Sequence, residues 1–319
     1  MRGRDTRRAP REGQSALGFP DGFPLRLSRL PMTTNTSPVG LVGLGPIGLA
    51  LTHRLLASGR AVMGYRRSPS RELVDLGGQD AASVADLAAR CETILLALPD
   101  GAACLGVLEA IIASAPDRRL VINTTSTPPT TAVALARLVE EQGHGYLEAP
   151  VSGAPHLVRA HGATLLVGGD EALFATQRSF LLDLAAHVTR VGEAGAASAV
   201  KSAALLMMVV NTLGAAEALA FAESFGVAAG CAIEALAAGP ASSAALSMRG
   251  PWMAERAYQP RIGTLTAFDA LVGAIQADAS TPTLMLAQAR GYFARAIEAG
   301  LGDLDAAAVY EMIRQKPGR

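Results

Sequence analysis

The sequence predicts an α/β domain with a doubly wound parallel sheet, followed by an all-α C-terminal domain. From residue 38 to about residue 194, short β-branched or leucine-rich runs alternate with helical patterns. Beyond residue 195 the strand-like runs stop and long alanine-rich helical patterns continue. The chain has 319 residues, half of them apolar, which is enough for two hydrophobic cores.

The alternating part predicts seven strands, with helical patterns such as 47–59 between most of them. These strands are expected at 39–43, 61–65, 92–98, 119–123, 145–149, 163–167 and 187–191. Alternation of this kind predicts a largely parallel sheet covered by helices.

In the helical part, breaks that contain glycine or proline are expected at 237–243, 249–252 and 280–283. The uncharged stretch 202–216 is shorter than the roughly 18 residues that a membrane span needs, so we expect a buried helix there.

The N-terminal residues differ from the rest of the chain. Residues 1–31 contain seven arginines, three acidic residues and four prolines, without helical or strand periodicity. They also lack the apolar core of a secretory signal. We expect residues 1–37 to be a disordered, arginine-rich extension, with a targeting or nucleic-acid-binding arm as the alternative. The two domains are then expected at 38–194 and 195–319.

Composition points to a small-molecule partner, with no nucleic acid and no membrane. The formal net charge is zero, and no long block of one sign follows residue 40. The three cysteines are widely spaced and have no histidine at metal-ligand spacing. They predict reduced core residues, no metal site and a cytoplasmic protein; they are Cys91, Cys104 and Cys231.

A glycine-rich turn follows the first predicted strand and opens a helix. It has the G-x-G-x-x-G pattern, made by Gly43, Leu44, Gly45, Pro46, Ile47 and Gly48. Gly43 is expected to make the tight turn, Gly45 to let the backbone approach a pyrophosphate, and Gly48 to let helix and strand pack closely. The pyrophosphate would lie at the positive end of the helix. This context predicts a Rossmann-type dinucleotide-binding domain.

The end of the second predicted strand favours NADP over NAD. An NAD site places a carboxylate there, but no acidic residue occurs between Gly48 and Glu72. The segment carries phosphate-binding side chains instead, namely Arg66, Arg67, Ser68 and Arg71.

Lysine is rare in this chain: of 28 basic residues only Lys201 and Lys316 are lysines. Lys201 opens an apolar helical pattern at the expected junction of the two domains. A cation gains nothing from the dipole at a helix start, so a functional reason is favoured over a solvated one. An ammonium there can protonate a carbonyl oxygen while hydride reaches its carbon.

From Val39 onward the chain resembles the β-hydroxyacid dehydrogenase (3-hydroxyisobutyrate dehydrogenase-like) family. The matching segments occur in the family's order, and they are GLGPIGLALTHRLLASG, LLALPDG (95–101), INTTSTPP (122–129), EAPVSGA (148–154) and GEAGAASAVKSAA (192–204). The resemblance implies that Lys201 is the general acid/base and that Ser152 and Gly153 bind the substrate. It also implies that Ser126 contacts the substrate and the nicotinamide half, that Leu98 and Pro99 line the cofactor site, and that the helical domain forms a homodimer.

Several positions depart from the family pattern. Ala204 stands where the family usually has asparagine, Ala154 replaces a glycine, and Phe268 replaces a lysine that precedes Asp269. These changes predict a more apolar pocket, which admits a larger or less polar carbonyl. The segment after Ala154 adds His156 and His161, either of which is a second acid or a solvated loop residue.

These observations favour an NADP(H)-dependent oxidoreductase that acts on a carbonyl or hydroxyacid substrate. One alternative is reduction of a C=N bond, as in imine reductases, which share this style of fingerprint but commonly place Asp or Tyr where this chain has Lys201. Another is a non-catalytic nucleotide-binding scaffold, suggested by Ala204 and Phe268. Retention of the lone internal lysine argues against the scaffold.

Overall fold

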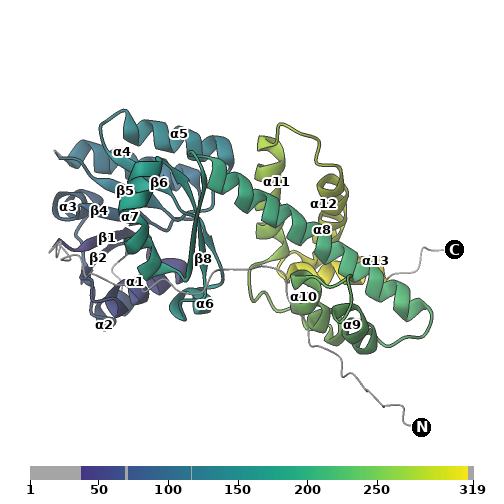
Figure 1. Ribbon diagram of the computed structural model, residues 1–319. Coiled ribbons are helices and arrows are strands. Elements are labelled where there is room, and N and C mark those ends of the chain that lie inside the picture. Colours follow the sequence, from purple (N-terminus) through teal and green to yellow (C-terminus); the bar gives the residue numbers. More distant parts are fainter. Residues whose placement is uncertain (1–36, 69–70, 116, 315–319) are drawn as a thin grey trace, which may run out of the picture. The chain divides into compact units, whose positions relative to one another are not determined.

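The structure, a computed structural model, describes residues 37–68, 71–115 and 117–314 (Figure 1). Nearly all of the predicted N-terminal extension and Lys316 lie outside these residues. The described part contains a nine-stranded sheet. Its strands are β1 (Val39–Val42), β2 (Val62–Tyr65), β3 (Gln79–Asp80), β4 (Thr93–Leu96), β5 (Leu120–Asn123), β6 (Gly145–Glu148), β7 (Val151–Ser152), β8 (Thr164–Gly169) and β9 (His187–Gly192). All seven predicted strands are confirmed, while β3 and β7, at two residues each, are too short to give a pattern.

The strand order is β3-β2-β1-β4-β5-β6-β8-β7, with β9 paired to β8. All neighbours from β3 to β6 are parallel, and β8 is antiparallel to β6 and β7. The direction of winding reverses between β1 and β4, which is where open α/β sheets bind their ligands. The predicted fold class is therefore confirmed.

Helices cover both faces of this sheet (Figure 1). They are α1 (Pro46–Ala57), α2 (Arg71–Asp75), α3 (Val84–Arg90), α4 (Gly101–Ser114), α5 (Pro129–Glu140), α6 (Pro155–Arg159) and α7 (Glu171–Leu184). Successive residues of a strand point to opposite faces, so Leu41 packs in the core with α1 and α7, while Val42 packs with α3, α4 and α5.

The C-terminal part is helical, as predicted. Its elements are α8 (Ala196–Ser224), α9 (Ala229–Ala237), α10 (Ala244–Glu255), α11 (Leu265–Asp278), α12 (Leu284–Ala296), η1 (Ile297–Leu301), η2 (Ala306–Ala308) and α13 (Val309–Ile313). A separate core fills this part, built around Val209, Leu219, Phe293 and Tyr310. The domain boundaries given above stay predictions.

Helix α8 is longer than the predicted helix, and only one side of it is buried. With 29 residues, the helix is long enough and apolar enough to cross a membrane. In this fold, however, it contacts β8 and β9 at its start and α9, α10, α12 and α13 along its length. Val209 is fully buried, whereas Met207 is 62% exposed. The helix expected to be buried at 202–216 is therefore buried on one side only.

Two further expectations are wrong. The break expected at 249–252 does not occur, because α10 continues through Pro251. Tertiary contacts hold this turn: the Arg249 guanidinium is buried and donates to Asp305 Oδ1 (2.8 Å) and Thr212 Oγ1 (3.2 Å). Cys91 and Cys104 are buried as expected, but Cys231 lies exposed on α9.

The Arg249–Asp305 ion pair is expected to be essential for the stability of the helical part. Asp305→Ala would leave the buried guanidinium without its counter-charge, which costs about 3 to 5 kcal/mol of unfolding free energy. Urea unfolding measures the loss. Asp303→Ala, at an exposed carboxylate two residues away, is the matched control and should change stability little. Equal stability of the two variants would contradict this account.

Candidate functional site

The turn between β1 and α1 has one open glycine between two that are tightly packed. Gly43 has a φ of +100°, and a Cβ there would lie 2.2 Å from the Ala97 carbonyl oxygen. A Cβ on Gly48 would lie 1.9 Å from the Gly43 carbonyl oxygen. At Gly45, by contrast, a Cβ would meet no atom within 4 Å. Gly43 and Gly48 are thus required by the fold, and Gly45 faces space that a ligand can enter.

The start of α1 fits a phosphate group. Gly45 is its N-cap, Pro46 is in its first turn, and no side chain caps it. The first N–H groups of an α-helix have no partner within the helix, and together with the helix dipole they favour an anion. A pocket of about 650 Å³ opens here, lined by Gly45 and Pro46.

Charged side chains of both signs line the same pocket. Arg66 comes from the end of β2 and Arg159 from α6, while Glu72 and Asp75 come from α2. Arg67, Ser68 and Arg71 are exposed beside it and do not line it. Sequence reasoning singled out the arginines but did not consider that a short helix would bring two carboxylates to this place.

The loops after β4 and β5 are joined by a buried polar network. The Leu98 N–H donates to Thr125 Oγ1 (3.0 Å), and the Thr125 N–H donates to Asn123 Oδ1 (3.0 Å). Asn123 Nδ2 in turn donates to the Tyr146 hydroxyl (3.0 Å). The network fixes Leu98 and the neighbouring Pro99 relative to the loop that carries the half-buried Ser126. Asn123 and Thr125 were missed by the sequence analysis, although both lie in the segment INTTSTPP.

Lys201 lies beside the predicted substrate loop. Its Nζ donates to the Val151 carbonyl oxygen at 2.9 Å, next to the half-buried Ser152 and Gly153. Gly153 has a φ of +148°, and a Cβ there would lie 3.2 Å from the Ala163 side chain. The structure therefore brings together the lysine and the two residues that the family motif assigns to substrate binding.

The surroundings of Lys201 favour loss of its proton. Burial lowers the pKa of its ammonium below the ordinary value. Among the described residues, no carboxylate lies within 4.0 Å of Nζ to oppose this effect. The sequence predicted that Lys201 opens the helix, and this is wrong. Helix α8 begins at Ala196, so Lys201 stands in its second turn.

Ala204 and Phe268, which depart from the family pattern, lie in different surroundings. Ala204 is exposed on α8. The Phe268 ring packs in the helical core, 6.1 Å from the Phe293 ring and 5.4 Å from the Arg249 guanidinium carbon. Phe268 therefore gives no support to a more apolar substrate pocket. Asp269 forms a bidentate pair with Arg290 (2.9 and 3.1 Å).

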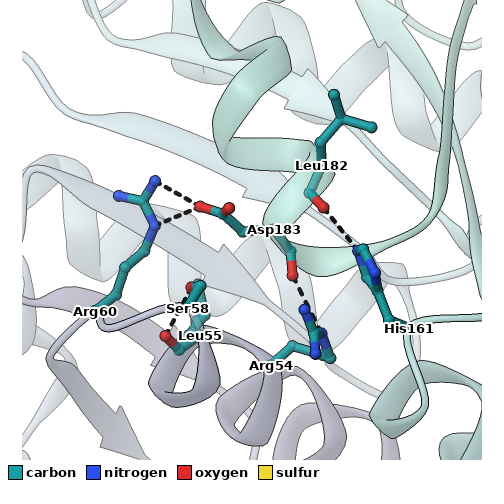
Figure 2. Close-up of polar contacts among 7 residues, drawn as sticks. All are labelled: Arg54, Leu55, Ser58, Arg60, His161, Leu182 and Asp183. Carbon is teal, nitrogen blue, oxygen red and sulfur yellow. Dashed lines mark hydrogen bonds and ion pairs between the residues drawn. The ribbon is translucent and has the colours of Figure 1, made fainter. Parts of the chain in front are cut away.

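His161 contributes to a different cluster (Figure 2). Its Nε2 lies 2.8 Å from the Leu182 carbonyl oxygen at the end of α7. Arg54 donates to the Asp183 carbonyl oxygen (3.2 Å), and Arg60 pairs with the Asp183 carboxylate (2.6 Å). This cluster connects α1, α7 and the end of α6, and it gives no support to His161 as a second acid. His156 is exposed.

Two family models match successive parts of the chain. The NAD binding domain of 6-phosphogluconate dehydrogenase matches residues 38–192. The NAD-binding domain of NADP-dependent 3-hydroxyisobutyrate dehydrogenase matches residues 195–313. L-threonate dehydrogenase of Cupriavidus necator is 30% identical over 287 residues, which cover 86% of this chain and 95% of that protein. The chain belongs to the β-hydroxyacid dehydrogenase family.

Other members of the β-hydroxyacid dehydrogenase family match less of their length. Mitochondrial 3-hydroxyisobutyrate dehydrogenase of Bos taurus is 29% identical over 191 residues, which are 57% of this chain and 56% of the bovine protein. The chain thus spans little more than half of that relative.

Solved structures agree with the fold. 3-Hydroxyisobutyrate dehydrogenase of Mycobacterium tuberculosis, determined with L-serine, has a TM-score of 0.80 at 23% identity and covers 87% of this chain and 99% of its own. An imine reductase of Myxococcus stipitatus in complex with NADP⁺ has a TM-score of 0.60 at 23% identity, over 86% and 99% of the two chains.

Substitutions at Gly45 and Gly48 in the β1–α1 turn are expected to affect cofactor binding and folding separately. Gly45→Ala should leave the melting temperature near that of the wild type, because its Cβ meets no atom of the chain, and should weaken dinucleotide binding at least tenfold. Gly48→Ala should lower the melting temperature, because its Cβ would clash with backbone. Thermal unfolding and fluorescence titration measure both effects. Unchanged cofactor affinity in Gly45→Ala would contradict this assignment.

Proposed function

We propose that this chain is an NADP(H)-dependent oxidoreductase that interconverts a carbonyl and a hydroxyl group, with Lys201 as general acid/base. The observation that carries this proposal is the contact between Lys201 Nζ and the Val151 carbonyl oxygen, which places the ammonium next to Ser152 and Gly153. Family membership supports a nicotinamide cofactor, since both matching family models describe NAD-binding domains.

The cofactor site is assigned to the turn at Gly43–Gly48, the arginines after β2 and the loops at Leu98 and Ser126. When bound, the nicotinamide ring would supply the hydride in reduction and accept it in oxidation. Open space at Gly45 and the uncapped start of α1 suit its pyrophosphate. Arg66 lines the pocket and suits a 2′-phosphate, and the exposed Arg67, Ser68 and Arg71 add donors beside it, which favours NADP over NAD.

Lys201 transfers the proton in this proposal. In reduction its ammonium donates to the carbonyl oxygen and stabilises the developing alkoxide, and in oxidation the neutral amine accepts the hydroxyl proton. The Val151 carbonyl oxygen only accepts hydrogen bonds, so it orients Nζ in either protonation state. The lowered pKa makes the proton easier to release.

The substrate class follows from the loop beside the lysine. The Ser152 hydroxyl and the N–H groups around Gly153 are donors suited to a carboxylate. The proposed substrate is a small molecule with a carbonyl or hydroxyl group near a carboxylate. The relatives' names, L-threonate dehydrogenase and 3-hydroxyisobutyrate dehydrogenase, support a hydroxy acid.

Reduction of a C=N bond is the second candidate. The chain is similar to an imine reductase in its fold. A half-buried lysine beside the substrate loop favours a substrate whose reduction needs a proton, and a preformed iminium ion needs none.

We also propose that two copies of this chain associate through the helical part. Phe221 lies on α8 and is 67% exposed, and Phe225 directly follows α8 and is 74% exposed. Their ring centroids lie 5.1 Å apart. An apolar groove of about 590 Å³ adjoins them, with Phe221 and Leu236 among its lining residues. A two-fold contact pairs one surface with itself, so the rings of one copy can fill the groove of the other.

NADPH should bind at least tenfold more tightly than NADH, since one arginine–phosphate contact contributes roughly 1.5 to 3 kcal/mol. Arg66→Ala should remove most of this preference, because Arg66 lines the pocket. Arg178→Ala, at an exposed arginine on α7, is the control. Equal affinities of the wild type for the two cofactors in a fluorescence titration would refute the NADP assignment.

Lys201→Ala should lower kcat by roughly 10² to 10⁴ and leave NADPH affinity nearly unchanged. Lys201→Arg should be nearly as slow, because a guanidinium effectively cannot release its proton. In the wild type, carbonyl reduction should slow as the pH rises through the lowered pKa of Lys201, since only the ammonium donates a proton. Steady-state kinetics with aldehydes, β-keto acids and cyclic iminium ions measure these effects. Wild-type kcat in the alanine variant on its best carbonyl substrate would show that Lys201 is structural.

Phe221→Glu should convert the dimer to a monomer, because the charge would have to be buried in an apolar contact. Sedimentation velocity measures the mass. Leu105→Glu, at a 43% exposed leucine on α4, should leave the dimer intact. A monomeric wild type would contradict the proposed association.

A further inference from the structure

A buried carboxylate from the sheet holds the first turn of α8. Glu148 is the last residue of β6 and is 2% exposed. Its Oε1 accepts a hydrogen bond from the Ala197 N–H (2.8 Å), and its Oε2 accepts one from the Ser198 hydroxyl (2.7 Å). Both carboxylate oxygens are therefore occupied by the start of the helix.

The local sequence explains why this acceptor comes from strand β6 and not from the residue that begins α8. The N-cap of α8 is Gly195, which has a φ of +94° and no side chain to cap the helix. A Cβ at Gly195 would lie 2.7 Å from Val133 Cγ2, so a larger residue has no room there. Glu148 supplies the missing acceptor, and its negative charge suits the positive end of the helix dipole.

Gly168 on the neighbouring strand makes room for this carboxylate. A Cβ at Gly168 would lie 2.3 Å from Glu148 Oε1. The carboxylate of Glu148 therefore depends on a glycine at position 168.

We infer that Glu148 is a positioning residue that holds Lys201 against the substrate loop. Lys201 follows Ala197 by four residues and Ser198 by three, so all three lie on one side of α8. The segment 148–153 then contacts this side twice, through the Glu148 carboxylate and through the Val151 carbonyl oxygen. This inference rests on the proposed function of Lys201, and it assigns a residue that acts only through that lysine.

The two-point contact makes the position of Nζ depend on the capping hydrogen bonds. Without the Glu148 acceptor, the Ala197 N–H and the Ser198 hydroxyl lose their buried partner. The first turn of α8 is then free to shift, and displacement of a reacting group by about 1 Å can cost about 10²-fold in rate.

Kinetics of three variants test the inference. Glu148→Ala should lower kcat by about 10²-fold without weakening NADPH binding. Glu148→Gln should restore most of kcat, because its amide oxygen still accepts from Ala197 N–H and its amide nitrogen can donate to Ser198 Oγ. Ser198→Ala removes only one of the two contacts and should give an intermediate kcat. Glu193→Ala is the matched control, because that carboxylate also precedes α8 but is exposed and pairs with Arg190.

A second measurement observes Lys201 without turnover. The chain has only two lysines, so protein labelled with ¹³C at lysine Cε gives two signals, and Lys316→Arg assigns them. In Glu148→Ala the Lys201 signal should move toward that of an exposed lysine, and in Glu148→Gln and Glu193→Ala it should stay in place. If Glu148→Ala does not fold, Ser198→Ala decides the question with the same two measurements.

The outcomes separate the two proposals. A wild-type kcat and an unmoved Lys201 signal in Glu148→Ala would overturn the positioning role. A Glu148→Gln variant as slow as Glu148→Ala would also overturn it, because the negative charge and not the hydrogen bonds would then matter. If Lys201→Ala retains full activity, the proposed function fails, while the shift of the Lys201 signal still tests whether Glu148 positions that side chain.

Discussion

The attachment of α8 to the end of β6 and to β7 is the contact on which the candidate site depends. Glu148 and Val151 belong to the α/β part of the fold, and Lys201 belongs to the first helix of the helical part. A second contact has the same character: the Asp278 carboxylate at the end of α11 accepts from the Thr130 N–H (3.0 Å) at the start of α5. In both places a carboxylate from one part accepts a hydrogen bond from a backbone N–H at the start of a helix in the other. Polar contacts of this kind need definite geometry, so they fix orientation in a way that apolar packing alone does not.

The parallel sheet explains why residues far apart in sequence meet at this contact. The carboxyl ends of β1, β2, β4, β5 and β6 lie at one edge, and each is followed by a loop that carries candidate site residues. Within this edge, the Asn123 side chain joins the loop after β5 to Tyr146 on β6, and Thr125 joins it to Leu98 after β4. A change at Asn123 would therefore disturb the loop after β4, through Thr125, and the contact with Tyr146 on β6.

Periodicity and glycine spacing were enough to predict the seven longer strands, the β1–α1 turn and the helical C-terminal part. They failed where tertiary contacts override local preference. Proline normally ends a helix, but α10 passes through Pro251 because the buried pair of Arg249 and Asp305 holds that turn. Phe268 was read as a pocket residue from its position in a motif, yet its ring packs against Phe293, and nothing in the sequence shows which side of α11 faces the core.

The candidate site residues show the same division. Lys201 could be found because lysine is scarce in this chain, a signal that needs no structure. Glu148 could not be found in this way, since a single glutamate in a strand has no spacing relation to Ser198 fifty residues later. Glu148 opens the segment EAPVSGA, but the segment does not show what its carboxylate binds. Two indirect signals exist: a glutamate in an otherwise apolar buried strand needs a partner, and Gly195 before a long helix leaves that helix without a side-chain cap.

The use of Glu148 also bears on the chemistry available to Lys201. A carboxylate paired with the ammonium would stabilise its charged form and raise the pKa, which opposes the transfer of a proton. Here the glutamate three residues before Val151 has both oxygens engaged by Ala197 and Ser198, and Lys201 is left with a carbonyl oxygen as its acceptor. Burial then lowers the pKa of Lys201 without an opposing counter-charge within 4.0 Å among the described residues. The hydrogen bonds that fix the start of α8 thus engage both oxygens of Glu148. In this way the carboxylate positions Lys201 without forming an ion pair with its ammonium.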